Sequence, residues 1–240
     1  MATTSAPHAR LRDRKFYILI SILLATIVFA GFARSFFLNS YFLKLQLRPL
    51  FIAHGIVFST WIGLIIVQTF LISAKQVRIH RKLGYASIAI VVAMIVFGFV
   101  MAVDAARRGF TPTPEVPPLR FFAISFFDLI NFTILITCAF LYRNKAEIHK
   151  RLILVSTVVI LTPATARIVF LFSDNGVLFK AYGIDLAVLL ICVLYDLYTR
   201  RKVHPAYLYA GGLFLVSIPA RIIISGTDAW LAFARRVTGT

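Results

Sequence analysis

Acidic residues are scarce in this chain of 240 residues. It contains 9 Asp and Glu against 26 Lys and Arg, so the formal net charge is +17. Charged residues of both signs make up only 15% of the chain, where a soluble domain carries about 25%. Hydrophobic residues reach 60%, and the mean hydropathy is +0.88. This balance argues against an ordinary soluble domain and indicates a chain that is solvated largely by lipid.

Cysteine is scarce as well, and familiar catalytic motifs are absent. Cys138 and Cys192 both fall inside apolar runs, without a Cys-x-x-Cys pair or the spacing of a disulfide framework. We expect them to pack as small apolar residues. No His-Glu-x-x-His helix for zinc hydrolysis and no evident set of serine, histidine and aspartate occurs. The motifs therefore do not decide whether the protein is an enzyme.

Seven long apolar runs predict seven transmembrane helices. Each run is long enough to cross about 30 Å of hydrocarbon as a helix, and none shows the alternation of a closed barrel. The first run is longer than the apolar core of a cleavable signal peptide, so we expect it to be retained. The predicted fold is an all-α integral membrane bundle. The runs lie at 16–37, 50–73, 84–104, 120–142, 151–172, 181–199 and 205–225.

Short basic segments between the runs predict the orientation. Together with a basic tail at residues 1–15, they predict a protein of the cell inner membrane, with the N-terminus in the cytoplasm and the C-terminus on the outer side. We expect these cations to contact anionic lipid headgroups, and we expect no nucleic-acid partner. The segments carry Lys75, Arg78, Arg81 and Lys82; Arg143, Lys145, Lys150 and Arg151; and Arg200, Arg201 and Lys202.

Two further segments flank or interrupt the predicted membrane domain of residues 16–226. The loop at 105–119 contains four prolines, Pro112, Pro114, Pro117 and Pro118, and we interpret it as an extended lid over the outer mouth. Residues 227–240 combine aromatic and basic side chains, which is typical of an amphipathic helix that lies in the membrane interface.

An imperfect internal repeat divides the chain. Three predicted helices begin near a histidine, in Ile-His-Arg-Lys-Leu-Gly, Ile-His-Lys-Arg-Leu and Val-His-Pro-Ala-Tyr-Leu. Two of them end alike, with Pro-Ala followed by Arg167 or Arg221. The distance from His149 to Arg167 is 18 residues and that from His204 to Arg221 is 17, which is one membrane transit at about 1.5 Å per residue. We therefore predict a lead helix followed by three helical hairpins.

These helix starts resemble an uncharacterised family of predicted bacterial multi-pass membrane proteins. That family is marked by a His-Arg-x-Leu-Gly start and, one hairpin later, by a His-(Lys/Arg)-x-(Leu/Met) start with an arginine near the helix end. The matching positions are 80–84, 149–152 and Arg167, within a resemblance that covers about residues 50–172. The His-Pro start at His204 departs from this pattern. The resemblance implies a multi-pass membrane protein and no particular activity.

The repeated histidines suggest a metal site. His80, His149 and His204 would lie at similar depth on the inner face and could form an open three-coordinate site for a transition metal such as zinc, copper or iron. Haem would need two such histidines at matching depth, and His54, the histidine clearly inside a run, has no partner histidine at its depth. The alternative is that each histidine caps its helix or contacts lipid phosphate in the headgroup region.

A second group of ionisable side chains lies in the outer part of the runs. Charged groups inside a membrane are costly unless paired or solvated, so we expect them to face the bundle interior or a water-filled cavity. Asp128 and Asn131 are three residues apart and share one helical face. The arginines outnumber the aspartates, which suits a small anionic or polar ligand in an outward-facing pocket. The group comprises Arg34, His54, Asp128, Asn131, Arg167, Asp185 and Arg221.

Three functional hypotheses remain open from the sequence. The first is a ligand-binding or transport-like bundle that uses the outer group. The second is a metal- or haem-dependent membrane oxidoreductase or hydrolase that uses the three inner histidines. The third is an accessory subunit of a membrane complex. The rival explanation for the outer group is that its arginines and aspartates pair and lock helices together.

Overall fold

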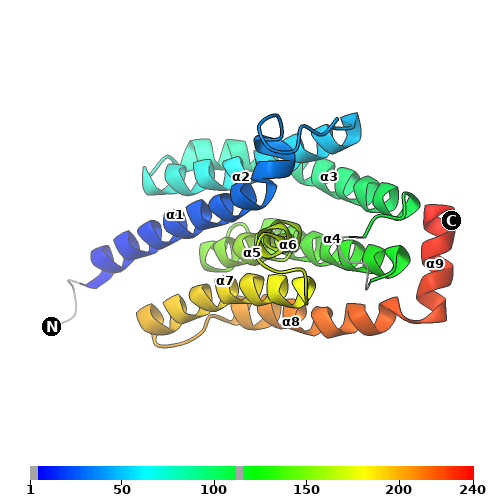
Figure 1. Ribbon diagram of the computed structural model, residues 1–240. Coiled ribbons are helices and arrows are strands. Elements are labelled where there is room, and N and C mark those ends of the chain that lie inside the picture. Colours follow the sequence, from blue (N-terminus) through cyan, green and yellow to red (C-terminus); the bar gives the residue numbers. More distant parts are fainter. Residues whose placement is uncertain (1–4, 112–115) are drawn as a thin grey trace. The chain divides into compact units, whose positions relative to one another are not determined.

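Long helices dominate the computed structural model, which describes residues 5–111 and 116–240, with side chains from residue 11 onward (Figure 1). No β-strand occurs among these residues. Six of the described helices are long and apolar enough to cross a membrane, and one bent pair of shorter helices provides a seventh crossing if the pair is a single span. The protein is an all-α, multi-pass membrane bundle, as the sequence predicts.

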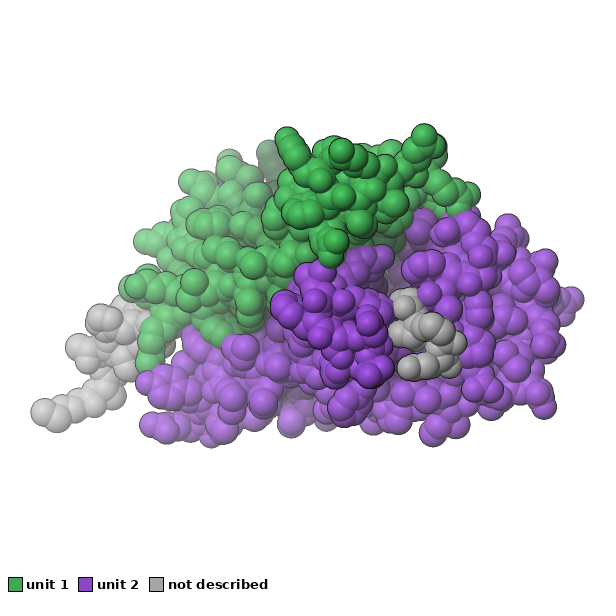
Figure 2. All heavy atoms as spheres, viewed as in Figure 1, with its two compact units in different colours: residues 1–97 green, residues 98–240 purple. Residues whose placement is uncertain are grey.

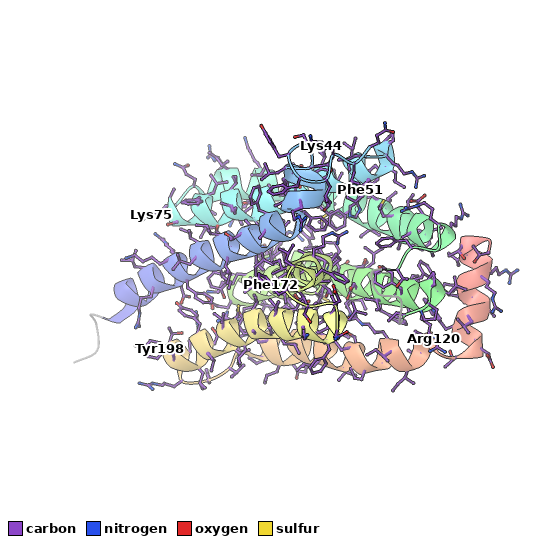
Figure 3. The ribbon with its side chains drawn as sticks, in the orientation of Figure 1. Lys44, Phe51, Lys75, Arg120, Phe172 and Tyr198 are labelled. Carbon is purple, nitrogen blue, oxygen red and sulfur yellow. The ribbon has the colours of Figure 1, made fainter. Side chains whose placement is uncertain are left out.

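The chain divides into two compact units, residues 1–97 and 98–240, which Figure 2 colours separately. The first contains α1 (Ser5–Phe32), the short π-helix η1 (Ala33–Phe37), α2 (Pro49–Ser73) and most of α3 (Val77–Arg107). The basic tail predicted over residues 1–15 is therefore helical from Ser5. Lys44 lies in the loop before α2, and Lys75 lies in the turn after it (Figure 3).

Small polar contacts join α1 to α2 in the first unit. The hydroxyl groups of Ser21 and Thr69 lie 3.2 Å apart, and Arg14 Nη1 donates a hydrogen bond of 3.2 Å to the carbonyl of Ser73. Lipid is as apolar as a leucine side chain, so apolar burial alone gives little drive for helices to associate within it. Close packing and contacts of this kind hold such helix pairs together.

The second unit contains the end of α3 and six further helices. These are α4 (Pro118–Leu141), α5 (Ala146–Val158), α6 (Thr162–Phe170), α7 (Val177–Arg200), α8 (Pro205–Ser225) and α9 (Asp228–Thr238). Helix α4 packs against α5 and α8, while α7 packs against α5 and α6. Phe132 and Phe214 are fully buried where α4 and α8 contribute to the interior. Proline stands at the first residue of α2, α4 and α8, where its missing N–H removes no helical hydrogen bond.

The fifth predicted span, residues 151–172, is not one straight helix. It divides into α5 and α6, which meet at an angle of 42°. Pro163 has no N–H, so the carbonyl of Val159 cannot receive the helical hydrogen bond from that position. The chain turns through bonds from Leu161 N to Val158 O (3.0 Å) and from Ala164 N to Leu161 O (2.8 Å). The structure thus corrects the sequence-based prediction of an uninterrupted helix.

The second proline of the repeated Pro-Ala pattern behaves differently. Pro219 lies inside α8, which continues to Ser225. Pro163, in contrast, occupies the second position of α6, directly after the break. The two endings that look alike in sequence are therefore structurally distinct, and the sequence repeat is not matched by a repeat in helix structure.

Helix α9 runs across α4 and α8 at one end of the second unit (Figure 1). Trp230 and Ala234 are buried against Ala106 of α3 and Phe122 of α4. Trp230 Nε1 donates to the carbonyl of Leu119 (2.9 Å). The predicted C-terminal helix is therefore formed, and one face of it belongs to the core. Its place in the membrane interface remains a prediction, and Pro112 and Pro114 of the predicted lid lie outside the described residues.

Candidate polar site within the membrane helices

A buried ion pair joins two helices of the second unit. Arg221 of α8 donates from Nη1 to the carboxylate of Asp128 on α4. The arginine side chain is fully buried and the aspartate side chain nearly so. Asn131 shares the Asp128 face of α4 and donates from Nδ2 to Ser217 Oγ of α8 (2.8 Å). The structure thus brings together three of the residues that the sequence singles out.

The remaining donors of Arg221 bind two residues that the sequence-based prediction missed. Nε and Nη2 donate to the carbonyl (3.0 Å) and to the hydroxyl (2.7 Å) of Ser217, and Nη1 donates to the hydroxyl of Tyr182 on α7 (3.2 Å). Ser217 lies four residues before Arg221, a spacing that could have pointed to it. No feature of the sequence distinguishes Tyr182 from a tyrosine that lies at the membrane interface. We call Asp128, Asn131, Tyr182, Ser217 and Arg221 the Arg221 cluster.

Asp185 adjoins this cluster but has different hydrogen-bond partners. Its Oδ2 lies 2.7 Å from Thr162 Oγ1 and its Oδ1 lies 3.0 Å from Thr165 Oγ1, and all three side chains are buried. Both threonines belong to α6, at the start of that helix. Asp185 also interacts electrostatically with Asp128 and Arg221. The carboxyl group therefore ties α7 to α6 beside the break in the fifth span.

The other predicted members of the outer group have local contacts of their own. Arg167 Nη1 donates to the carbonyl of Pro163, four residues earlier in the same helix (2.7 Å). Arg34 is exposed in η1, and the His54 ring stacks on Phe58 in α2 with a centroid separation of 4.1 Å. Both of these residues belong to the first unit, so their membership of one pocket with Arg221 remains a prediction.

The charges around Arg221 differ from those of the whole predicted group, in which arginines outnumber aspartates. Together with the adjoining Asp185, the Arg221 cluster has two carboxyl groups, on Asp128 and Asp185, and one guanidinium, on Arg221. The immediate surroundings of Arg221 therefore carry no surplus positive charge.

The three histidines of the metal hypothesis make separate local contacts. His149 Nδ1 lies 2.8 Å from the carbonyl of Ala139 on α4, and His204 Nδ1 accepts from the backbone N–H of Ala206 (3.1 Å). His80 belongs to the first unit. Across residues 5–111 and 116–240, no group of three or more His, Cys, Asp or Glu side chains is arranged to hold a metal ion. The alternative of a helix-capping histidine is confirmed for His204, whereas the metal and haem hypotheses gain no support.

A second buried arginine was not recognised from the sequence. Arg151, counted there among the basic loop residues, is fully buried and binds Asp196 of α7 through Nε (2.9 Å) and Nη2 (2.5 Å). Its Nη1 donates to Glu147 Oε2 (2.8 Å). Arg200 adds ion pairs to Glu147 (2.9 Å) and to Asp196 (3.4 Å). We call Glu147, Arg151, Asp196 and Arg200 the Arg151 cluster.

His204 connects the start of α8 to the Arg151 cluster. Its backbone N–H donates to Asp196 Oδ2 (3.3 Å). Partial burial and the positive charge of Arg151 lower the pKa of the imidazole, against an opposing effect of Asp196. A neutral ring keeps the Nδ1 lone pair that accepts from Ala206, so the lowered pKa favours the cap.

The two clusters lie at different depths of the same bundle. Asp185 and Asp196 are both on α7, and 11 residues of helix correspond to about 16 Å along the axis. Tyr198, which follows Asp196 by two residues, is labelled near the C-terminal end of α7 in Figure 3. The two clusters are thus separated along α7, and the Arg151 cluster lies toward the C-terminal end of that helix.

No family model, curated protein or solved structure matches this chain.

Proposed function

We propose that this membrane protein binds a small polar ligand within the bilayer, at the Arg221 cluster. Polar and ionisable side chains are costly at membrane depth and mark ligand or ion pathways when they occur there. The cluster draws its members from α4, α7 and α8 and lies next to a discontinuous helix. Discontinuous helices are typical of substrate sites in membrane transport proteins.

The internal ion pair bears on the chemistry of the ligand. Arg221 is already neutralised by Asp128, so a purely anionic ligand would leave the aspartate as an uncompensated buried charge. An uncharged or zwitterionic ligand avoids this cost, because its own donor or cation can take the place of Arg221 beside Asp128. The hydroxyl of Tyr182 accepts from Arg221 and still has its own hydrogen to donate. We therefore favour the polar part of the sequence-based expectation over the anionic part.

The observation that carries this proposal is the surroundings of Arg221. Its fully buried guanidinium binds groups from α4, α7 and α8 at once. A ligand that competes for any of these bonds would change how the three helices contact one another. Binding at this position would therefore be coupled to helix arrangement, which a transport-like protein requires.

A thermal-unfolding screen tests the proposal. Purified protein is mixed with a panel of amino acids, sugars and short hydroxy acids, and we expect at least one solute to raise the unfolding temperature. Asn131→Ala should abolish the shift. Thr133→Val is the matched control, because that hydroxyl bonds within its own helix to Leu129 O (2.7 Å). Absence of a shift with every solute, or a shift unchanged in Asn131→Ala, would overturn the proposal.

The proposed orientation places the N-terminus in the cytoplasm of a cell with an inner membrane. The basic segments around Lys75, Lys145 and Lys202 support it through the positive-inside rule, although Arg151 is buried in an ion pair and no longer counts as a loop charge. If α5 and α6 form one crossing, the chain has seven spans and its termini lie on opposite sides. Reporter fusions after Lys75 and Thr240 test this, and the same side for both would contradict it.

A further inference from the structure

The Asp185 carboxyl group differs from the other buried aspartates of the second unit. Asp128 and Asp196 each bind a guanidinium directly. Asp185 is fully buried, and within the described chain its hydrogen bonds come from the hydroxyls of Thr162 and Thr165, without an ion pair to Lys, Arg or His. An ionised carboxylate in this position would be compensated only at a distance.

The hydrogens around Thr165 favour the protonated form of Asp185. Thr165 Oγ1 lies 3.1 Å from the carbonyl of Thr162 and 3.0 Å from Asp185 Oδ1. A threonine hydroxyl has one hydrogen to donate, and a carbonyl oxygen can only accept. If Thr165 donates to the carbonyl, its contact with Asp185 needs a hydrogen on Oδ1. A carboxylic acid at Asp185 therefore satisfies both contacts, whereas a carboxylate leaves one of them without a proton.

The charges that face Asp185 also favour its protonated form. Asp128 from α4 and Arg221 from α8 interact with it electrostatically, and Tyr182 lies one turn earlier on α7. On α6 the charged side chain is Arg167, whose Nη1 binds the carbonyl of Pro163. Of the described charges, those of Asp128 and Arg221 act on Asp185 and that of Arg167 does not, so an ionised Asp185 would leave two carboxylates against one guanidinium inside the membrane. One proton makes the group neutral and removes that cost.

The location of Asp185 gives its proton a structural consequence. Thr162 and Thr165 form the start of α6, directly after the break that Pro163 imposes. With the proton present, the carboxyl group donates to Thr165 and accepts from Thr162, so α6 is held to α7. If the O–H bond of the carboxyl group breaks and the proton passes to water, the donor to Thr165 is lost and a second negative charge appears beside Asp128. Both changes weaken the contact between α6 and α7.

We propose that Asp185 is a proton-binding site, protonated on Oδ1 at neutral pH, whose proton holds α6 against α7 at the break in the fifth span. The site goes beyond the ligand-binding function above, because it requires no ligand at the Arg221 cluster. Its partner is a proton, exchanged with water.

Infrared spectroscopy of the full chain in lipid vesicles tests this assignment. A protonated carboxyl group has a carbonyl stretch that a carboxylate lacks, and isotope-labelled aspartate identifies it as an aspartic acid. At neutral pH we expect this band in the wild type and its loss in Asp185→Asn. It should persist in Asp128→Leu with Arg221→Met, which removes both charges of the ion pair, and in Asp174→Asn, which changes an exposed loop residue. In Thr165→Val the frequency of the band should change, because the hydrogen of the carboxyl group loses its acceptor.

Two results would overturn the proposal. One is the absence of a protonated-aspartate band in the wild type at neutral pH, a result that needs no variant. The other is a band that remains in Asp185→Asn, since the proton would then belong to a different aspartate. If Asp185→Asn does not fold, the spectra of the wild type and of Thr165→Val test the assignment. A band whose frequency is the same in both proteins would also contradict it.

Discussion

The second unit contains two buried arginines in contrasting surroundings. Arg151 and Arg221 each have a fully buried side chain that binds an aspartate from another helix. Around Arg151 the network continues to Glu147, whose side chain is 48% exposed, and to the partly exposed Arg200. Around Arg221 the further partners are neutral hydroxyl and carbonyl groups. One cluster reaches solvent through further charges, and the other is enclosed.

This difference separates a structural role from a binding role. The Arg151 cluster joins α5, α7 and the start of α8 near their ends, where every charge has an opposite charge beside it. Such a network fixes helix positions and leaves little for a ligand to compete with. The Arg221 cluster has a single ion pair surrounded by exchangeable hydrogen bonds. A ligand could replace those bonds without exposing several charges.

The largest effect is expected at Asp196. Asp196→Ala leaves the buried guanidinium of Arg151 with the partly exposed Glu147 as its remaining carboxylate. We expect the free energy of unfolding, measured by SDS titration, to fall by about 3–5 kcal/mol. Thr199→Val is the control on the same helix, because its hydroxyl bonds to Tyr195 O (2.6 Å). A loss as small as that of the control would contradict a structural role for the cluster.

Removal of both charges sharpens the comparison. Replacement of a buried ion pair by apolar residues is often neutral or stabilising by about 1–4 kcal/mol, so Asp128→Leu with Arg221→Met should fold at least as well as the wild type. The same exchange at Asp196 and Arg151 should destabilise the protein. Glu147 would lose Arg151, and both Arg200 and the His204 N–H would lose Asp196. Thermal unfolding of both double variants measures the contrast. Equal behaviour would show that the two clusters do not differ in this way.

A smaller effect is expected at the exposed edge of the Arg151 cluster. Glu147→Gln keeps the shape of the side chain and removes its charge, which pairs with Lys150, Arg151 and Arg200. We expect a loss of about 0.2–1 kcal/mol, because solvent screens a half-exposed carboxylate, and we expect the loss to shrink in high salt. Asp174→Asn in an exposed loop is the matched control. A salt-independent loss would place Glu147 in the buried part of the network.

The smallest effect concerns pH and His204. The pKa of this histidine is lowered in the folded state by burial and by Arg151, so the unfolded chain binds the proton more readily. The resulting stability is fully present above the unfolded pKa and is lost as pH falls through the folded pKa. His204→Asn keeps a capping acceptor without titration, so its stability should depend less on pH between about 5 and 7. Identical pH profiles for the two proteins would exclude this role.

Much of the fold could be predicted from the sequence because the deciding properties are local. Length and hydropathy of each run predict a membrane helix, and proline at Pro49, Pro118 and Pro205 coincides with helix starts. The shared face of Asp128 and Asn131 follows from helical spacing alone. Pro163 and Pro219 show the limit of local reasoning, since the same Pro-Ala pair begins a helix after a break in one case and lies inside a helix in the other.

The candidate site was only partly predictable, because contacts between helices are not local. The sequence placed Asp128, Asn131, Asp185 and Arg221 in one group but could not show which of them bind one another directly. It placed three histidines at helix starts, yet the Nδ1 atoms of His149 and His204 are occupied by backbone groups. No feature of the sequence around Arg151 distinguishes this buried residue from its basic neighbours.

The sequence by itself determined that this protein is a helical, multi-pass membrane protein. Backbone polar groups are costly to expose to lipid, and a long apolar run that crosses the membrane satisfies them within itself by forming a helix. Only the tertiary structure decided which arginine faces which aspartate. Those pairs join residues 45 and 93 positions apart, and a buried charge is tolerated only where its partner arrives from another helix. The same dependence on distant partners left Asp185 with two threonines and made it the candidate proton site.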